Sequence, residues 1–297
     1  MSYLQLYASP SRTFSGFQTE FSKARYAVLG VPFDGTSTYR ADSRFAPQAV
    51  RDASLNVETY SFRSGLDVEG LPICDCGDLT VQVDVDETLR RIERATQELH
   101  LGQKIPVLLG GEHTITLGAI RALSPSVGVV DFDAHMDLRD EYMGARLSHA
   151  TVMRRVAESL GPSRLVQVGI RAACKEELQF AEQNGLTYLT ARRLQTEGAT
   201  ALAALRRVME PWEEVYVSID MDVLDPAYAP GVGNPEPEGL STTVLLDILA
   251  EACDGRVKAI DLTEVAPHYD MGQTAVQAAR ILFEALCYVE SSLDRQG

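Results

Sequence analysis

The feature that most constrains the fold is an alternation along the chain between short apolar runs rich in Val and Ile and longer amphipathic segments with helical periodicity. This alternation is typical of strands that enter a parallel sheet and are connected by helices. The expected strands are Tyr26–Val31, Ile105–Leu109, Val127–Val130, Leu165–Ile170, Val215–Ile219 and Val257–Leu262. The expected helices are Glu87–His100, Ala150–Leu160, Ser241–Cys253 and Thr274–Tyr288. The predicted fold class is therefore α/β.

The sequence contains no recognisable linker. No stretch rich in Gly, Ser or Pro interrupts the chain, and no repeat of fixed period is visible. A chain of 297 residues, 45% of them hydrophobic, can bury the core of one α/β domain. We therefore predict a single domain over residues 1–297, in which residues 1–25 form an N-terminal extension.

The charge and the targeting signals of the chain disfavour several classes of partner. A formal net charge of −15 disfavours nucleic acid and anionic membranes, because both bind clustered Lys and Arg, and it favours a cationic substrate. The N-terminus lacks a secretory signal, and no apolar run approaches the roughly 18–20 residues of a membrane span. The five scattered cysteines do not suggest a disulfide framework. We expect a soluble, cytoplasmic protein.

Acidic and histidine side chains follow four of the predicted strands directly. The four segments are Gly110-Gly111-Glu112-His113, Asp131-Phe132-Asp133-Ala134-His135-Met136-Asp137, Asp220-Met221-Asp222, and Glu264. In open parallel sheets the functional groups gather at the carboxyl ends of the strands. Asp133, His135 and Asp137 alternate, so in an extended segment they point to one side, and Asp220 and Asp222 repeat that spacing. We expect these side chains to share one crevice.

A crowd of carboxylates is unfavourable unless cations neutralise it, because each buried negative charge raises the cost of ionising the next. Carboxylates with a minority of imidazoles suit a hard or borderline ion, and the imidazoles favour Mn²⁺ over Mg²⁺. Six candidate ligands suit two ions about 3.5–4 Å apart. Taken alone, Asp220-Met221-Asp222 also fits a turn and a lone His113 also fits a structural role. For Cys74-Asp75-Cys76, a strand or loop is favoured over a metal site.

The segments 110–114, 133–137 and 218–226 together resemble the signatures of the ureohydrolase (arginase/agmatinase) family, and the resemblance extends from Gly30 to Pro267. It implies a three-layer αβα sandwich with a mainly parallel eight-stranded sheet, and a centre of two Mn²⁺ per subunit at the strand ends. The ligands that match by motif position are His113, Asp133, His135, Asp137, Asp220 and Asp222. Asp133 and Asp220 match the ligands that bridge both ions, whereas Asp131 is interpreted as a supporting or structural residue. The resemblance also implies a homo-oligomer, a trimer or hexamer.

Two further residues gain roles from the resemblance. His149 resembles the histidine proposed to shuttle protons at the mouth of the site, and its alternative is a structural position at the start of a helix. Glu264 resembles the carboxylate that pairs with the substrate guanidinium, and its alternative is a surface ion pair. The implied reaction is attack on the guanidinium by a metal-bridging hydroxide, which gives urea and an amine. Asp137 is the candidate proton donor to the leaving amine, and His149 exchanges protons with solvent.

The identity of the guanidine depends on loops around the site. The loop 138–148 lacks the asparagine with which arginases recognise an α-amino acid, and it resembles agmatinase loops. Agmatine, cleaved to urea and putrescine in polyamine biosynthesis, is the expected substrate, with Asp140 or Glu141 as candidate partners of its second cation. Arg139 or Arg146 would instead suit a guanidino acid such as guanidinobutyrate or guanidinopropionate, and that alternative stays open.

Other activities and classes are weaker alternatives. Hydrolysis of arginine or of formimidoylglutamate would use the same metal centre. A deacetylase with a single zinc ion predicts fewer carboxylate ligands than this sequence offers. A catalytically silent metal-binding protein predicts that a ligand is missing, but all six are present. The loop Gly35–Phe45 is expected near the mouth of the site, with Arg40 and Arg44 as possible contributors.

Overall fold

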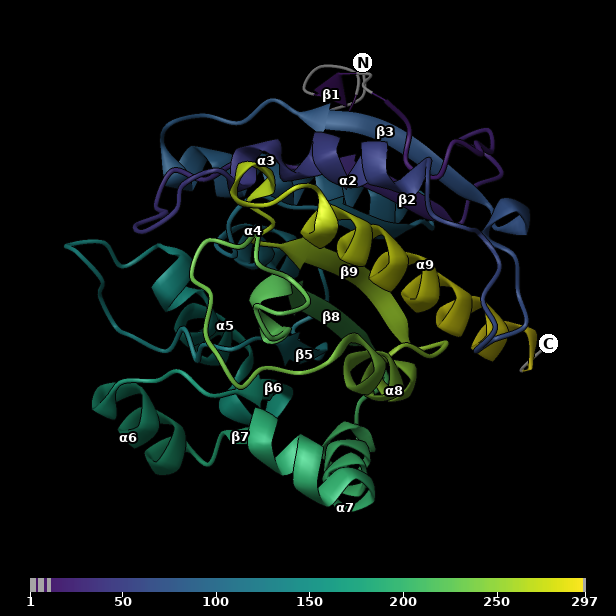
Figure 1. Ribbon diagram of the computed structural model, residues 1–297. Coiled ribbons are helices and arrows are strands. Elements are labelled where there is room, and N and C mark those ends of the chain that lie inside the picture. The colour runs from purple at the N-terminus through teal and green to yellow at the C-terminus, as the bar shows by residue number, and fades with distance from the viewer. Residues whose placement is uncertain (1–3, 5–7, 10–11, 296–297) are drawn as a thin grey trace.

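The computed structural model describes residues 4, 8–9 and 12–295, and its central feature is a sheet of strands between helices (Figure 1). The strands are β1 (Ala8–Ser9), β2 (Tyr26–Gly30), β3 (Ile73–Leu79), β4 (Ile105–Leu109), β5 (Gly128–Phe132), β6 (Leu165–Ile170), β7 (Thr187–Thr190), β8 (Val215–Asp220) and β9 (Val257–Thr263). The helices are α2 (Ala46–Ser54), α3 (Val85–Leu101), α4 (Ile115–Arg121), α5 (Val152–Leu160), α6 (Lys175–Asn184), α7 (Ala191–Met209), α8 (Thr242–Ala252) and α9 (Gln273–Asp294).

The described strands form one sheet in the order β1-β3-β2-β4-β9-β8-β5-β6-β7. Every neighbouring pair from β3 to β7 is parallel, whereas the two-residue β1 runs antiparallel to β3 at the edge. Strands β2, β5, β6 and β8 are buried at every position, which explains their mostly apolar sequences. The predicted mainly parallel eight-stranded sheet is confirmed, with β1 added at its edge.

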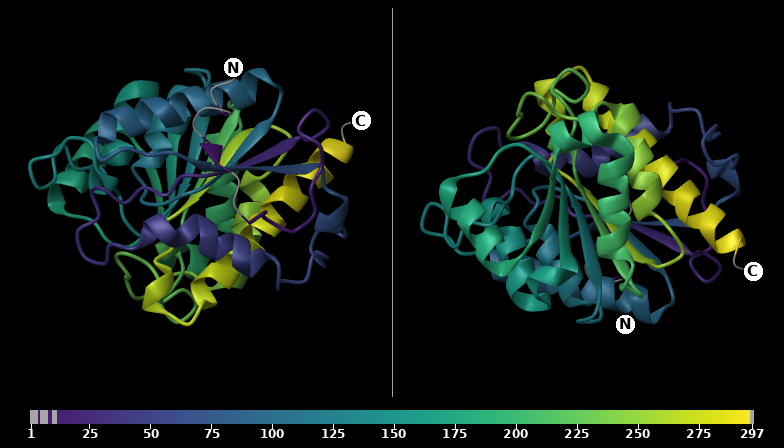
Figure 2. Two further views of the ribbon diagram at one scale, coloured as in Figure 1. Left: turned by 90° about the horizontal axis from the view of Figure 1, so that it is seen from above. Right: turned by 90° about the horizontal axis from the view of Figure 1, so that it is seen from below.

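Two layers of helices cover the sheet. Helices α2, α7, α8 and α9 bury their apolar side chains in one hydrophobic cluster, and α3, α4, α5 and α6 bury theirs in a second cluster on the opposite face. Figure 2 shows the strands edge-on between these two layers. The predicted three-layer αβα sandwich is confirmed.

All six predicted strands are present, but β1, β3 and β7 were not predicted as strands of the sheet. The segment Cys74-Asp75-Cys76 lies in β3, which agrees with the strand interpretation of that segment. Strand β3 was not predicted because Asp75 and Asp78 interrupt its apolar sequence. Both aspartates pair with the fully buried Arg51 of α2, at 2.7 Å and 2.5 Å. Strand β7 has only four residues and is buried at only one of them.

The four predicted helices are present with shifted ends. Helix α5 begins at Val152, because His149–Thr151 forms a separate 3-10 turn before it. Helix α9 continues beyond the predicted Tyr288 to Asp294. Among the described residues, no helix has the length and apolar content that a membrane span requires.

The predicted N-terminal extension lies partly outside the described residues, which omit 1–3, 5–7 and 10–11. In its described part, β1 pairs with β3, and Phe14 is fully buried with its ring 5.3 Å from that of Phe283 in α9. The single-domain organisation over residues 1–297 stays a prediction.

The sheet order brings together strands that are distant in sequence. The chain forms β4, β5, β8 and β9 in that order, but β9 and β8 insert between β4 and β5. The four strands whose ends bear the acidic and histidine residues are therefore direct neighbours, in the order β4-β9-β8-β5. Since parallel strands end at the same edge, their terminal side chains converge on one place.

Candidate metal centre

Each predicted ligand lies at the carboxyl end of a central strand. His113 stands in the turn between β4 and α4. Asp133, His135 and Asp137 follow β5. Asp220 is the last residue of β8, Asp222 lies in the 3-10 turn Met221–Val223, and Glu264 follows β9 directly. The structure thus places every predicted site residue of these segments at the same edge of the sheet.

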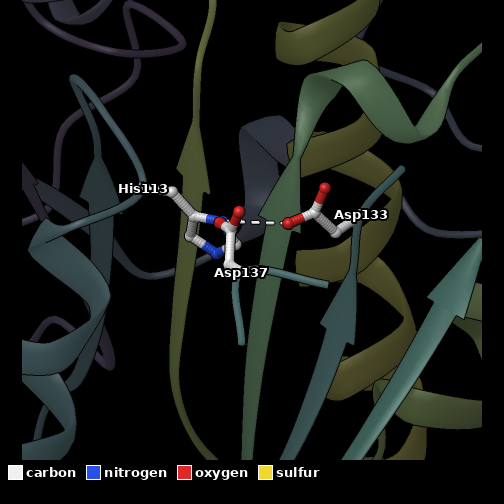
Figure 3. Close-up of side chains that lie close together, drawn as sticks. All are labelled: His113, Asp133 and Asp137. Carbon is white, nitrogen blue, oxygen red and sulfur yellow. Dashed lines mark ion pairs between the residues drawn. The ribbon is translucent and has the colours of Figure 1, made fainter. Parts of the chain in front are cut away.

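Two groups of side chains could each hold a metal ion: His113, Asp133 and Asp137 form the first, and Asp133, His135 and Asp222 form the second. In the first group, His113 Nδ1 lies 3.1 Å from Asp133 Oδ2 and 3.2 Å from Asp137 Oδ2, and Figure 3 shows these side chains close together. In the second group, His135 Nδ1 lies 3.0 Å from Asp222 Oδ2 and 3.5 Å from Asp133 Oδ1. Asp133 therefore offers one oxygen to each group, as a bridging ligand requires.

Asp220 lies beside the first group. Its Oδ2 is 3.5 Å from His113 Nδ1, and its Oδ1 accepts a hydrogen bond from the backbone N–H of Asp222 at 2.8 Å. The same turn places Asp222 so that its Oδ1 accepts from the backbone N–H of Ala134 at 3.1 Å. The alternation in the sequence thus places Asp220 beside the first ligand group and Asp222 in the second.

The chemistry of this cluster fits divalent cations. In the described chain, His113 Nδ1 and Asp133 Oδ2 are buried without a hydrogen bond, which is costly unless another partner is present. Burial and the charge of Asp133 raise the pKa of Asp137 to about 8, and burial and Asp222 raise the pKa of Asp220 well above its usual range. Cations at this position would provide partners for these two unpaired atoms and would keep the carboxylates ionised. Carboxylates and imidazoles without a thiolate suit hard or borderline ions.

The far side of the His113 ring is held by buried polar groups. His113 Nε2 lies 3.0 Å from Ser218 Oγ, and Ser218 donates to Asp261 Oδ1 at 2.7 Å. Asp131 Oδ1 lies 3.4 Å from the same nitrogen, and its other oxygen accepts from Gln167 at 2.9 Å. Such partners fix the orientation of a ligand imidazole and leave Nδ1 for the metal. The position of Asp131 agrees with a supporting role, whereas Ser218 and Asp261 were not predicted.

Glu264 borders the first ligand group. Its Oε1 accepts a hydrogen bond from the backbone N–H of His113 at 2.8 Å, and burial and Glu112 raise its pKa to about 8. Glu264 and Asp137 have backbone φ angles of 65° and 51°, values that are uncommon outside glycine and that often occur at functional sites. Gly233 faces Glu264, and a Cβ atom there would lie 2.9 Å from Oε2. Glu264 is therefore a buried pocket residue, which excludes the surface ion pair considered from the sequence.

His149 is buried at the start of the 3-10 turn before α5, and it lines the same pocket as the ligands. Its backbone N–H donates to Thr36 Oγ1 at 3.1 Å, and its ring nitrogens lie 3.2 Å from Thr36 Oγ1 and 3.5 Å from Thr38 Oγ1. Burial, with the charges of His135 and His113, lowers the pKa of His149 to about 4. An imidazole with this pKa is neutral at pH 7.

The loop 35–45 reaches the site through threonines rather than arginines. Glu112 Oε1 accepts from Thr36 Oγ1 at 2.5 Å, and Glu112 Oε2 accepts from the backbone N–H of Thr36 at 2.7 Å. Arg44 pairs with Asp34 at 2.8 Å, and Arg40 donates to the backbone of Pro230 at 3.3 Å. The predicted position of this loop agrees with the structure, but its two arginines lie outside the pocket lining.

Five of the six predicted ligands, all except Asp133, line a pocket of about 440 Å³. Its lining also includes Thr38, Arg139, Tyr142, Ala150, Arg171, Ala172, Ala173, Cys174, Glu177, Asn234 and Glu236. Of the residues considered for the substrate tail, only Arg139 lies in this lining. Asp140 and Arg146 instead pair with each other at 2.9 Å outside it, and Glu141 also lies outside it.

Comparisons with known proteins agree with this architecture. The sequence matches the arginase family over residues 24–288. It is 38% identical over 290 residues to the N(1)-aminopropylagmatine ureohydrolase of Thermococcus kodakarensis, with 96% of this chain and 97% of that protein covered. It is 35% identical over 286 residues to the agmatinase of Halalkalibacterium halodurans, with 94% and 97% covered. The structure is similar to that of the agmatine ureohydrolase of Thermoplasma volcanium, with a TM-score of 0.91, 34% identity, and 97% of this chain and 98% of that chain covered.

Proposed function

Since the chain belongs to the arginase family of enzymes, we propose that it hydrolyses the guanidino group of agmatine to give urea and putrescine. The observation that supports this most is the meeting of Glu264 with two groups of potential metal ligands in one pocket. A carboxylate beside a metal centre suits a planar cation such as a guanidinium. Relatives named agmatinase and aminopropylagmatine ureohydrolase favour agmatine or a close derivative.

The two ligand groups are proposed to hold two Mn²⁺ per subunit. The proposed ligands are His113, Asp133, His135, Asp137, Asp220 and Asp222. Mn²⁺ is favoured because the set mixes imidazoles with carboxylates. When bound, two such cations would acidify a water molecule and so supply a strong nucleophile at neutral pH.

The side chains of the pocket have separate tasks in the proposed reaction. Glu264 orients the substrate by accepting two hydrogen bonds from the guanidinium. Asp137 takes up a proton and donates it to the nitrogen of the leaving amine. His149 lines the pocket beside the ligand groups, and its task is to exchange protons between the site and solvent.

Urea release by the Mn²⁺-loaded protein tests the proposed function. We expect kcat/KM for agmatine to exceed that for arginine, guanidinobutyrate and guanidinopropionate by about tenfold or more, because the pocket must discriminate the far end of the substrate. Preference for a guanidino acid would support the proposed hydrolysis but would show that agmatine is not the preferred substrate. If no guanidine yields urea, the chain is a metal-binding protein without this activity.

Replacing His149 with alanine should slow turnover without emptying the metal centre. We expect kcat for agmatine to fall by about 10²-fold, because proton exchange with solvent would lose its side chain. Metal content should not change, since His149 belongs to neither ligand group. His100→Ala, in the last turn of α3, is the matched control. An unchanged kcat for His149→Ala at every pH between 6 and 9 would remove His149 from the mechanism.

Assembly and location stay predictions. The expected homo-oligomer, a trimer or hexamer, can be measured by sedimentation equilibrium of the purified protein. The expected cytoplasmic location can be measured by fractionation of cells that express it.

A further inference from the structure

Glu236 is an acidic residue of the pocket that has no task in the proposed reaction. Its side chain is 42% exposed, and its Oε1 lies 3.9 Å from His135 Nε2. The other nitrogen of the same ring, Nδ1, faces Asp222 and Asp133 of the second ligand group. The His135 ring therefore lies between the Asp133 and Asp222 carboxylates on one side and Glu236 on the other. The Glu236 carboxylate thus borders the outer part of the pocket.

The backbone around Glu236 is fixed relative to the ligands. Arg171 Nη2 donates to the backbone carbonyl of Glu236 at 2.9 Å and to that of Asp222 at 2.6 Å. Arg171 Nε also donates to the carbonyl of Pro237 at 2.9 Å. One guanidinium thus connects the loop of Glu236 to the loop of a ligand, which holds the two loops in register.

The same loop passes close to both ends of the pocket. Gly233 packs against Glu264, and Glu236 follows three residues later beside His135. Three residues of chain span at most about 10 Å. That upper limit is of the same order as the length of a guanidinium joined to an ammonium by a four-carbon chain. A substrate whose guanidinium pairs with Glu264 could therefore bring its far end to Glu236.

Arg171 and Glu177, two other charged groups of the pocket, are engaged in hydrogen bonds within the described structure. Arg171 is committed to backbone carbonyls. Glu177 accepts from the backbone N–H groups of Leu138 at 3.0 Å and Cys174 at 2.7 Å. Arg139 lies over the ring of Tyr142 at 5.2 Å. No side-chain hydrogen bond to the Glu236 carboxylate is found among the described residues, so this carboxylate is available to a ligand.

We propose that Glu236 determines substrate specificity by binding the second cationic group of the substrate, an ammonium at the end of the alkyl chain. This inference rests on the proposed function and adds to it the residue that selects an amine over an acid. A partly desolvated carboxylate attracts an ammonium and repels the carboxylate of a guanidino acid. Support of His135 as a ligand is the competing role, but 3.9 Å exceeds hydrogen-bond distance.

Kinetics of Glu236→Gln with three substrates test this inference. The substrates are agmatine, guanidinobutyrate and butylguanidine, whose far ends are cationic, anionic and neutral, respectively. We expect KM for agmatine to rise by about 10- to 100-fold with little change in kcat, because one charge of a pair is removed. The kcat/KM for butylguanidine should stay within about twofold, and that for guanidinobutyrate should not fall.

Glu238→Gln is the matched control, because Glu238 is an exposed acid two residues along the same loop and lies outside the pocket lining. An equal effect of both variants would assign the change to long-range charge and overturn the proposal. A loss of bound metal, or an equal loss for all three substrates, would assign Glu236 to support of His135. An unchanged KM for agmatine would overturn the role of Glu236 alone, whereas absence of urea from every substrate with the unmodified protein would remove the proposed function as well.

Discussion

Replacing Asp133 with asparagine should abolish urea release and lower the metal content of the purified protein. Asp133 is the residue shared by both ligand groups, with Oδ2 directed to His113 and Oδ1 directed to His135. An amide removes the negative charge and replaces one of the two oxygens with a hydrogen-bond donor. Because a bridged pair of ions depends on that carboxylate, we expect kcat/KM to fall on the order of 10³-fold or more.

The Asp133→Asn protein should be dialysed, its metal content measured by plasma mass spectrometry, and its urea release compared with that of the unmodified protein. Asp140→Asn is the matched control, since Asp140 is a half-exposed acid that pairs with Arg146 and Arg155 outside the pocket lining. Circular dichroism establishes that each variant is folded. If Asp133→Asn keeps two ions per subunit and full activity, the proposed ligand set is wrong.

Replacing Glu264 with glutamine should leave the metal content unchanged and lower kcat/KM for agmatine. Glu264 belongs to neither ligand group, and its Oε1 accepts from the backbone N–H of His113, which the carbonyl oxygen of glutamine can also do. The variant therefore keeps the local backbone contact and loses the charge that faces the guanidinium. We expect kcat/KM for agmatine to fall by about 10²- to 10³-fold, as for loss of a charged group that positions a substrate.

Metal content and kcat/KM of Glu264→Gln should be measured on the same preparation. Glu251→Gln is the matched control, because Glu251 forms a surface ion pair with Arg206 at 2.5 Å. Loss of metal together with activity would make Glu264 a metal ligand instead of a residue that orients the substrate. Full kcat/KM with agmatine would leave Glu264 without a role in binding the guanidinium.

The four variants distinguish the parts of the site by whether metal, rate or substrate preference changes. Asp133→Asn is expected to remove metal and activity together, whereas Glu264→Gln and His149→Ala are expected to keep the metal and lose rate. Glu236→Gln is expected to keep both metal and kcat, and to change only the preference among substrates.

The sequence by itself determined the class of fold and the local geometry of the ligands. Six strands were predictable because each is a mostly apolar run that lies between two helical layers. The alternation of Asp133, His135 and Asp137, and of Asp220 and Asp222, predicted side chains that converge, because residues two apart in an extended segment share a face. The resemblance of those segments to the ureohydrolase family then assigned roles to His149 and Glu264.

Only the tertiary structure decided which strand ends are neighbours and which charged groups are engaged. The insertion of β9 and β8 between β4 and β5 places Glu264 beside His113, although 151 positions separate them along the chain. Thr36 contacts His149 through a loop that no local pattern connects to it. Asp140 looked available in the sequence but is paired with arginines, whereas Glu236 faces the pocket. Local patterns encode the shape of a segment, but the partners of a side chain depend on packing between segments distant in sequence.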